Sequence, residues 1–101
     1  MYLIQIFLPV FNKKQIPFPK AVYSQIQKRM LKKFGGITLY SRAGIEGLWG
    51  KAGHVEADQM IIAEIMVNKI ESSWWKKYKE RLEKQFAQDE ILMRYQETFK
   101  I

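Results

Sequence analysis

Three polar side chains that could do chemistry lie within segments that are otherwise mainly apolar. Glu64 is the single charge in the run QMIIAEIMV, while Tyr40 and Arg94 lie in the runs ITLYSR and ILMRYQETF. A carboxylate with a guanidinium and a phenol beside it can act as a general acid or base. In an apolar environment Glu64 also needs a partner, because an unpaired carboxylate is costly to remove from water, and Arg94 and Arg42 are the candidates. Two interpretations stay open: a Glu–Arg pair that fixes an interface, or a carboxylate that binds a ligand or transfers a proton.

A glycine-rich stretch, GIEGLWGKAG at residues 44–53, is the second candidate site. It holds four of the six glycines of the chain, one at every third position, with Trp49 in the middle. The stretch does not fit a phosphate-binding P-loop, because Gly50-Lys51 is followed by Ala52 rather than by serine or threonine. Connections longer than about 12 residues are commonly lids or binding loops. We therefore interpret residues 43–56 as a long hairpin connection that folds over the sheet or over a partner subunit, anchored by Trp49.

Hydrophobic periodicity predicts six elements that would position these side chains. Val22, Ile26, Met30 and Phe34 recur at every fourth residue, which is typical of a helix with one buried stripe. The run ITLYSR alternates apolar and polar residues, which is typical of a strand. The predicted elements are a strand over residues 2–10, a helix over 20–34, strands over 37–42 and 59–67, a helix capped by Ser72 or Ser73 that includes Phe86, and a strand over 91–99.

This β-α-β-β-α-β order predicts an α+β fold of the ferredoxin-like type, a four-stranded antiparallel sheet with both helices on one face. The chain has 101 residues, which is the size of one domain, so we expect residues 1–101 to form a single one. The predicted helix-side residues are Ile4, Ile6, Leu8, Ile37, Leu39, Ile61, Ala63, Ile65, Ile91 and Met93.

The polar residues that could do chemistry lie on the opposite, open face of the sheet. In the strand order 4-1-3-2, which is usual for this fold, Glu64 lies beside Gln5 and beside the Tyr40/Arg42 pair. Apolar side chains share that face: Phe7, Tyr40, Ile62, Met66 and Leu92. A monomer rarely exposes so large an apolar patch, so we expect a second copy of the chain or the Trp49 loop to cover it. The predicted ligand or interface residues are Gln5, Phe7, Tyr40, Arg42, Trp49, Glu64, Met66 and Arg94.

The charge of the chain is unevenly distributed. The formal net charge is +7, and residues 1–45 hold eight Lys/Arg and no acid, whereas residues 46–101 hold nine Lys/Arg and ten Asp/Glu. This asymmetry favours either an anionic partner or a solvated helix face. The third strand lacks the aromatic residues on which an RNA-recognition motif stacks bases, which argues against nucleic acid as a partner of the sheet.

Other classes of site are disfavoured by composition. The chain has no cysteine, and His54 is its one histidine, so we expect no metal site and no cofactor. The apolar start MYLIQIFLPVF has no positive charge before it, and no apolar run approaches the roughly 18 residues that span a bilayer. We therefore expect a cytoplasmic protein without membrane contact.

Several short motifs resemble a family of small, uncharacterised bacterial ferredoxin-like proteins. They are FGGITLY at residues 34–40, GLW at 47–49, EIMV at 64–67, WW at 74–75 and ILMR at 91–94. The architecture is also distantly similar to the dimeric α+β-barrel superfamily, which pairs two such sheets face to face and includes cofactor-free monooxygenases, haem-degrading enzymes and binding proteins. This resemblance concerns the fold alone, which does not fix an activity. His54 departs from the haem degraders, because it lies in or beside the loop rather than on a helix.

Two functions are consistent with these sequence features. The first is a homodimeric binding or interaction module, whose sheet face and Trp49 loop enclose an interface or a small apolar or aromatic ligand. The second is a cofactor-free enzyme in the same place, with Glu64 as acid or base, Arg94 as its charge partner and Tyr40 as a hydrogen-bond donor. A nucleic-acid-binding protein that uses the basic N-terminal half is a third, less favoured hypothesis.

Overall fold

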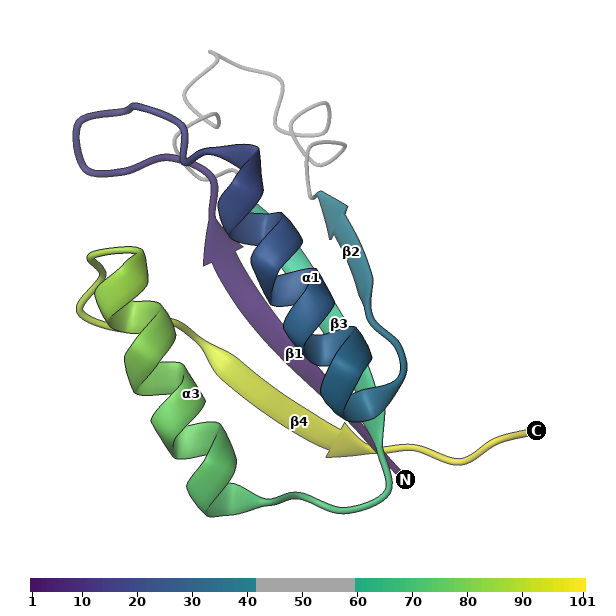
Figure 1. The fold of residues 1–101 in the computed structure, drawn as a ribbon. Coiled ribbons are helices and arrows are strands. Elements are labelled where there is room, and N and C mark those ends of the chain that lie inside the picture. The colour runs from purple at the N-terminus through teal and green to yellow at the C-terminus, as the bar shows by residue number, and fades with distance from the viewer. Residues whose placement is uncertain (42–59) are drawn as a thin grey trace, which may run out of the picture.

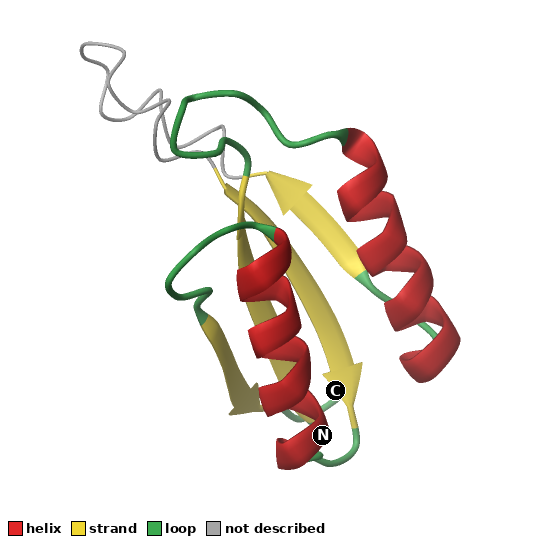
Figure 2. Cartoon of the chain, turned by 60° about the vertical axis from the view of Figure 1, so that its left-hand side comes forward, coloured by secondary structure: helices red, strands yellow, loops and turns green. Residues whose placement is uncertain are grey.

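The computed structural model describes residues 1–41 and 60–101. In chain order, the elements of these residues are β1 (Tyr2–Pro9), α1 (Lys20–Phe34), β2 (Thr38–Ser41), β3 (Met60–Val67), α3 (Ser72–Gln85) and β4 (Met93–Glu97). The strands form one antiparallel sheet in the order β2-β3-β1-β4. Both helices pack on the same face of that sheet (Figures 1 and 2). The ferredoxin-like α+β plait predicted from the sequence is therefore confirmed.

The core lies between the sheet and the two helices. On β1, alternate residues Ile4, Ile6 and Leu8 are all buried, as the period of two requires. They pack with residues of every layer, namely Ile26, Met30, Ala63, Ile65, Val67, Trp75, Tyr78, Leu82, Phe86 and Ile91. Strand β1 is central because it pairs with β3 along its whole length and with β4 over five positions.

Helix α1 begins and ends where the periodicity predicts. Ile26 and Met30 form its buried stripe, and the helix ends at Phe34. Gly35 follows with a φ of 83° and donates its backbone N–H to the carbonyl of Leu31 at 2.9 Å. This left-handed conformation favours glycine, which has no side chain to clash with the backbone.

Two details of the second half differ from the prediction. Ser72 and Ser73 lie inside the first turn of α3, so neither is the cap; Glu71 occupies the N-cap position without a side-chain hydrogen bond. Strand β4 is also shorter than expected, because it begins at Met93 rather than at Ile91. The backbone N–H of Ile91 donates to the Glu83 carboxylate at 3.0 Å instead of to a neighbouring strand.

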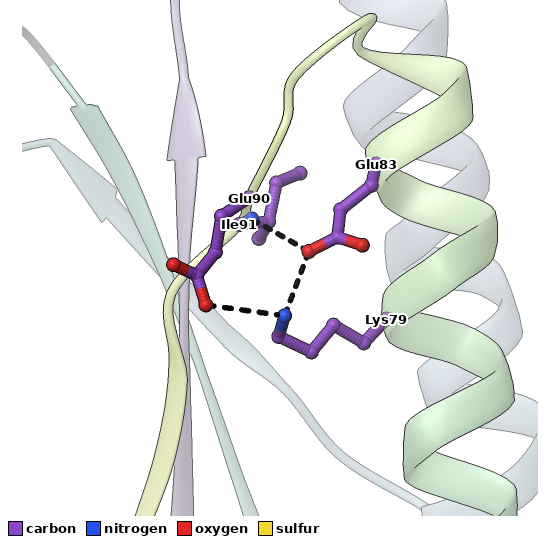
Figure 3. Close-up of polar contacts among 4 residues, drawn as sticks. All are labelled: Lys79, Glu83, Glu90 and Ile91. Carbon is purple, nitrogen blue, oxygen red and sulfur yellow. Dashed lines mark hydrogen bonds and ion pairs between the residues drawn. The ribbon is translucent and has the colours of Figure 1, made fainter.

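That contact belongs to a small polar cluster that joins α3 to the start of β4 (Figure 3). Lys79 Nζ lies 2.7 Å from Glu83 Oε2 and 3.5 Å from Glu90 Oε2. The hydrogen bond from Lys79, together with the N–H of Ile91, lowers the pKa of the Glu83 carboxyl. The hydrogen bond to Glu83 in turn raises the pKa of Lys79. Glu83 is thus held as a carboxylate between a cation and a backbone donor.

Among the described residues, no helix has the length and apolar composition to cross a membrane.

The Glu83 cluster makes the free energy of unfolding dependent on pH. Because the pKa of Glu83 is lowered in the folded chain, its contribution is complete above the unfolded-state pKa and is lost as pH falls through the folded-state pKa. We expect Glu83→Gln to lower the free energy of unfolding in urea at pH 7, and the difference from the wild type to shrink towards pH 3. Glu80→Gln is the matched control, since Glu80 is exposed on the same helix. Equal losses in the two variants, or a difference that persists in acid, would contradict the assignment.

Candidate functional site

The strand register brings the predicted polar residues to one level of the sheet. Gln5 pairs with Glu64 on β3 and with Arg94 on β4, and Glu64 pairs in turn with Thr38 on β2. The neighbours of Gln5 along β1, Ile4 and Ile6, are buried against the helices. Because successive side chains of a strand point to opposite faces, Gln5 and its partners lie on the face that the helices leave open.

Four side chains form a hydrogen-bonded row across this face. Arg94 Nε donates to Gln5 Oε1 at 2.9 Å, and Gln5 Nε2 donates to Glu64 Oε2 at 2.7 Å. The Tyr40 hydroxyl donates to the same Glu64 oxygen at 3.0 Å. We call Arg94, Gln5, Glu64 and Tyr40 the polar row; its members come from β4, β1, β3 and β2 respectively, so it spans the sheet from edge to edge.

One of the two partners predicted for Glu64, Arg94, does not contact it directly. Arg94 does not reach the carboxylate, and none of the ion pairs within residues 1–41 and 60–101 involves Glu64. The reason is the strand order: β1 lies between β3 and β4, which are two strand spacings, roughly 9–10 Å, apart. Gln5 bridges this gap, since its amide accepts from the guanidinium and donates to the carboxylate. Arg42, the other predicted partner, lies outside the described residues.

The polar row has unused hydrogen-bonding capacity at both of its charged groups. Glu64 is half-buried, and within the described part of the chain both of its hydrogen bonds go to Oε2, which leaves Oε1 open. Arg94 is exposed and uses only Nε in the row. Its guanidinium carbon lies 4.9 Å from the centre of the Phe7 ring, a cation–π contact that restrains the group near this ring. The arrangement can therefore bind an anion at Arg94 and accept a proton or hydrogen bond at Glu64.

The apolar residues of the open face divide into two groups by their exposure. Phe7 and Ile62 pair in register on the central strands, and they are only 6% and 5% exposed. Around them, Tyr40, Met66 and Leu92 are 41%, 47% and 51% exposed. The interior of the patch is thus already shielded within one chain, and the accessible apolar surface lies around it.

Leu92, which the sequence places on the open face, belongs to the site but is missing from the predicted ligand or interface residues. It precedes β4, and its carbonyl accepts a hydrogen bond from the backbone N–H of Phe7 at 3.0 Å. Leu92 therefore lies beside Phe7, which pairs with Ile62 on its other side. The signal was present in the sequence, because Leu92 is two residues from Arg94 and must share its face in an extended segment. Two other predicted features, Trp49 and the 43–56 connection around it, lie outside the residues that the structure describes, as does His54.

Metal-binding potential can be assessed for the described residues alone. Within them, no three His, Cys, Asp or Glu side chains gather in a way that could hold a metal ion.

Comparison of the chain with protein-family models, curated proteins and solved structures finds no match in any of the three. The fold is therefore assigned from strand order and pairing, and the resemblance to small bacterial ferredoxin-like proteins stays a prediction.

Proposed function

We propose that this protein is a homodimeric interaction module that docks its open sheet face against the same face of a second copy. The observation that supports this most is the polar row, with unused capacity at Glu64 and Arg94, on a face that neither helix covers. Exposed Tyr40, Met66 and Leu92 lie on the same face. A polar centre combined with accessible apolar side chains is common at protein interfaces.

The order of charges along the polar row suits a two-fold symmetric contact. Such an interface must be complementary to itself, because the same patch is used by both copies. Glu64 and Arg94 are paired to opposite sides of Gln5, one strand away in each direction. A two-fold axis that lies between the two sheets, over Gln5 and parallel to the strands, therefore brings Arg94 of each copy over Glu64 of the other. Each charge then gains an oppositely charged partner, which residues 1–41 and 60–101 of its own chain do not supply.

The exposed apolar residues would supply most of the non-directional contact energy. Complete burial of a leucine or methionine side chain contributes roughly 1.5–3 kcal/mol relative to full exposure. Met66 and Leu92 are each about half exposed in the single chain, so burying the rest of each side chain at the interface would contribute roughly half of that free energy. The ion pairs, by contrast, would mainly select the orientation of the two copies.

The first test of this proposal places a charge in the proposed interface. We expect the wild type to sediment as a dimer at micromolar concentration, and Leu92→Asp to raise the dissociation constant on the order of 100-fold, because the carboxylate has no partner there. Leu31→Asp is the matched control: Leu31 is 47% exposed, but it lies on α1, on the other side of the molecule. A monomeric wild type, or equal dissociation by the two variants, would contradict the proposal.

The second test addresses the pairing of the polar row. Arg94→Glu and Glu64→Arg should each weaken dimerisation by placing like charges opposite each other. In the double variant the two charges exchange positions. Gln5 can rotate its side-chain amide so that it still donates to the carboxylate and accepts from the guanidinium. We therefore expect dimerisation to recover in part. Sedimentation equilibrium of the wild type, the two single variants and the double variant gives the coupling free energy between the two side chains. Effects that simply add would show that the two side chains do not meet across an interface.

A cofactor-free enzyme is the second candidate, because two donors orient the Glu64 carboxylate through Oε2, while no described residue bonds to Oε1. In this case Glu64 would transfer a proton to or from a small apolar or aromatic substrate, with Tyr40 and Gln5 orienting it. Turnover of such compounds that is abolished in Glu64→Gln, with dimerisation and thermal stability unchanged, would favour the enzyme. Turnover retained in that variant would exclude Glu64 as its acid or base.

A further inference from the structure

The helix layer presents a surface of a different kind. Helix α1 contains five Lys/Arg and no acidic residue, and α3 contains five Lys/Arg and two Glu. Both helices lie on the face of the sheet opposite to the polar row (Figure 2). An anion is the ligand class that this charge favours.

A groove of about 480 Å³ runs between the two helices. It is lined by Gln25, Ile26 and Arg29 of α1 and by Tyr78, Arg81 and Gln85 of α3. Ile26 and Tyr78 are 3% and 4% exposed, whereas the two arginines and the two glutamines are exposed. The groove therefore combines an apolar and aromatic base with polar and cationic walls. Ligand pockets typically measure about 300–1,000 Å³, so a small organic ligand fits this volume.

The two guanidinium groups of the groove are available to a ligand. The ion pairs among the described residues are made by Lys33 and Lys79, and neither Arg29 nor Arg81 takes part in one. On α3, the acids Glu80 and Glu83 lie about 100° or more around the helix axis from Arg81. No carboxylate of that helix therefore competes on the groove side.

Aromatic rings position one of these groups. The guanidinium carbon of Arg29 lies 5.3 Å from the centre of the Tyr78 ring and 5.7 Å from that of Trp74. Such cation–π contacts restrain the position of the guanidinium group. Arg29 is thus held at the groove before any ligand arrives.

The hydroxyl of Tyr78 adds a neutral donor. Tyr78 is 4% exposed, and none of the side-chain hydrogen bonds made within residues 1–41 and 60–101 uses its hydroxyl. Burial raises the pKa of Tyr78 to about 12, and the nearby positive charges of Arg29 and Arg81 oppose this rise without cancelling it. The phenol stays protonated at neutral pH and can donate to an anion.

We propose that the groove between α1 and α3 binds the phosphate group of a small phosphorylated metabolite, with Arg29 and Arg81 pairing its oxygens and Tyr78 donating a hydrogen bond. A phosphate monoester suits this set better than a carboxylate, because it carries nearly two negative charges and three terminal oxygens. The side-chain amides of Gln25 and Gln85 are placed to contact the rest of the ligand. This site is separate from the sheet face and does not depend on the dimer.

Titration by nuclear magnetic resonance tests this site in the intact chain. The probes are inorganic phosphate and adenosine 5′-monophosphate, with adenosine and acetate as controls, at constant ionic strength. We expect the side-chain N–H signals of Arg29, Arg81, Gln25 and Gln85 to shift with adenosine 5′-monophosphate. Arg29→Gln and Arg81→Gln should each weaken its affinity about tenfold, since each removes a charge-assisted pair.

Matched variants separate a built site from general attraction to a basic protein. Lys13→Gln and Lys14→Gln remove the same charge from exposed positions before α1, and we expect them to leave the affinity nearly unchanged. Arg29→Lys keeps the charge but loses the planar fork, and Tyr78→Phe keeps the ring but loses the donor, so both should weaken phosphate binding.

Three results would overturn the proposal. One is an equal loss of affinity in the lysine and arginine variants; another is acetate binding as tight as that of the monophosphate. The third is tighter binding of a DNA duplex than of the monophosphate, lost in Arg29→Gln and Arg81→Gln, which would assign the groove to a nucleic-acid backbone. A thermal melt of each variant by circular dichroism shows that the fold is retained.

Discussion

The central position of β1 is the constraint on which both faces of the molecule depend. Its alternation buries Ile4, Ile6 and Leu8 against the helices and directs Gln5 to the open side. Because β1 pairs with β3 and β4 at once, the Gln5 amide is the one group of the row that reaches both Glu64 and Arg94. The same backbone pairing that builds the core therefore assembles the polar row.

The anchoring of β4 links the helix layer to that row. Glu83 on α3 accepts the N–H of Ile91, three residues before Arg94, and Lys79 holds the carboxylate in its ionised form. β4 is an edge strand, which lacks a neighbour on one side and frays more readily than a central strand. A fixed start at Ile91 limits this fraying and keeps Arg94 in register with Gln5.

The two helices concentrate positive charge on one side because their buried stripes take up the apolar residues. Arg29 and Lys33 lie over the rings of Trp74, Tyr78 and Phe34, where the aromatic faces partly compensate for the repulsion between neighbouring cations. The open sheet face, in contrast, presents the carboxylate of Glu64, the guanidinium of Arg94 and apolar side chains within the part of the chain that the structure describes. One surface thus suits an anion, and the other suits a self-complementary contact.

The sequence by itself determined the elements, their order and the faces to which side chains point, because the periods of helices and strands are local properties of the backbone. The boundaries of α1 and the burial of Ile4, Ile6 and Leu8 on β1 and of Ala63 and Ile65 on β3 follow from that local rule. Which residue meets Glu64 was decided only by the tertiary structure: face assignment places Arg94 on the same side, but two strand spacings separate the two groups. The burial of Phe7 and Ile62, the contact of Glu83 with Ile91 and the groove between Arg29 and Arg81 likewise depend on distances between segments far apart in the chain. A periodicity carries no information about such distances, because it repeats along one segment and does not record what packs against it.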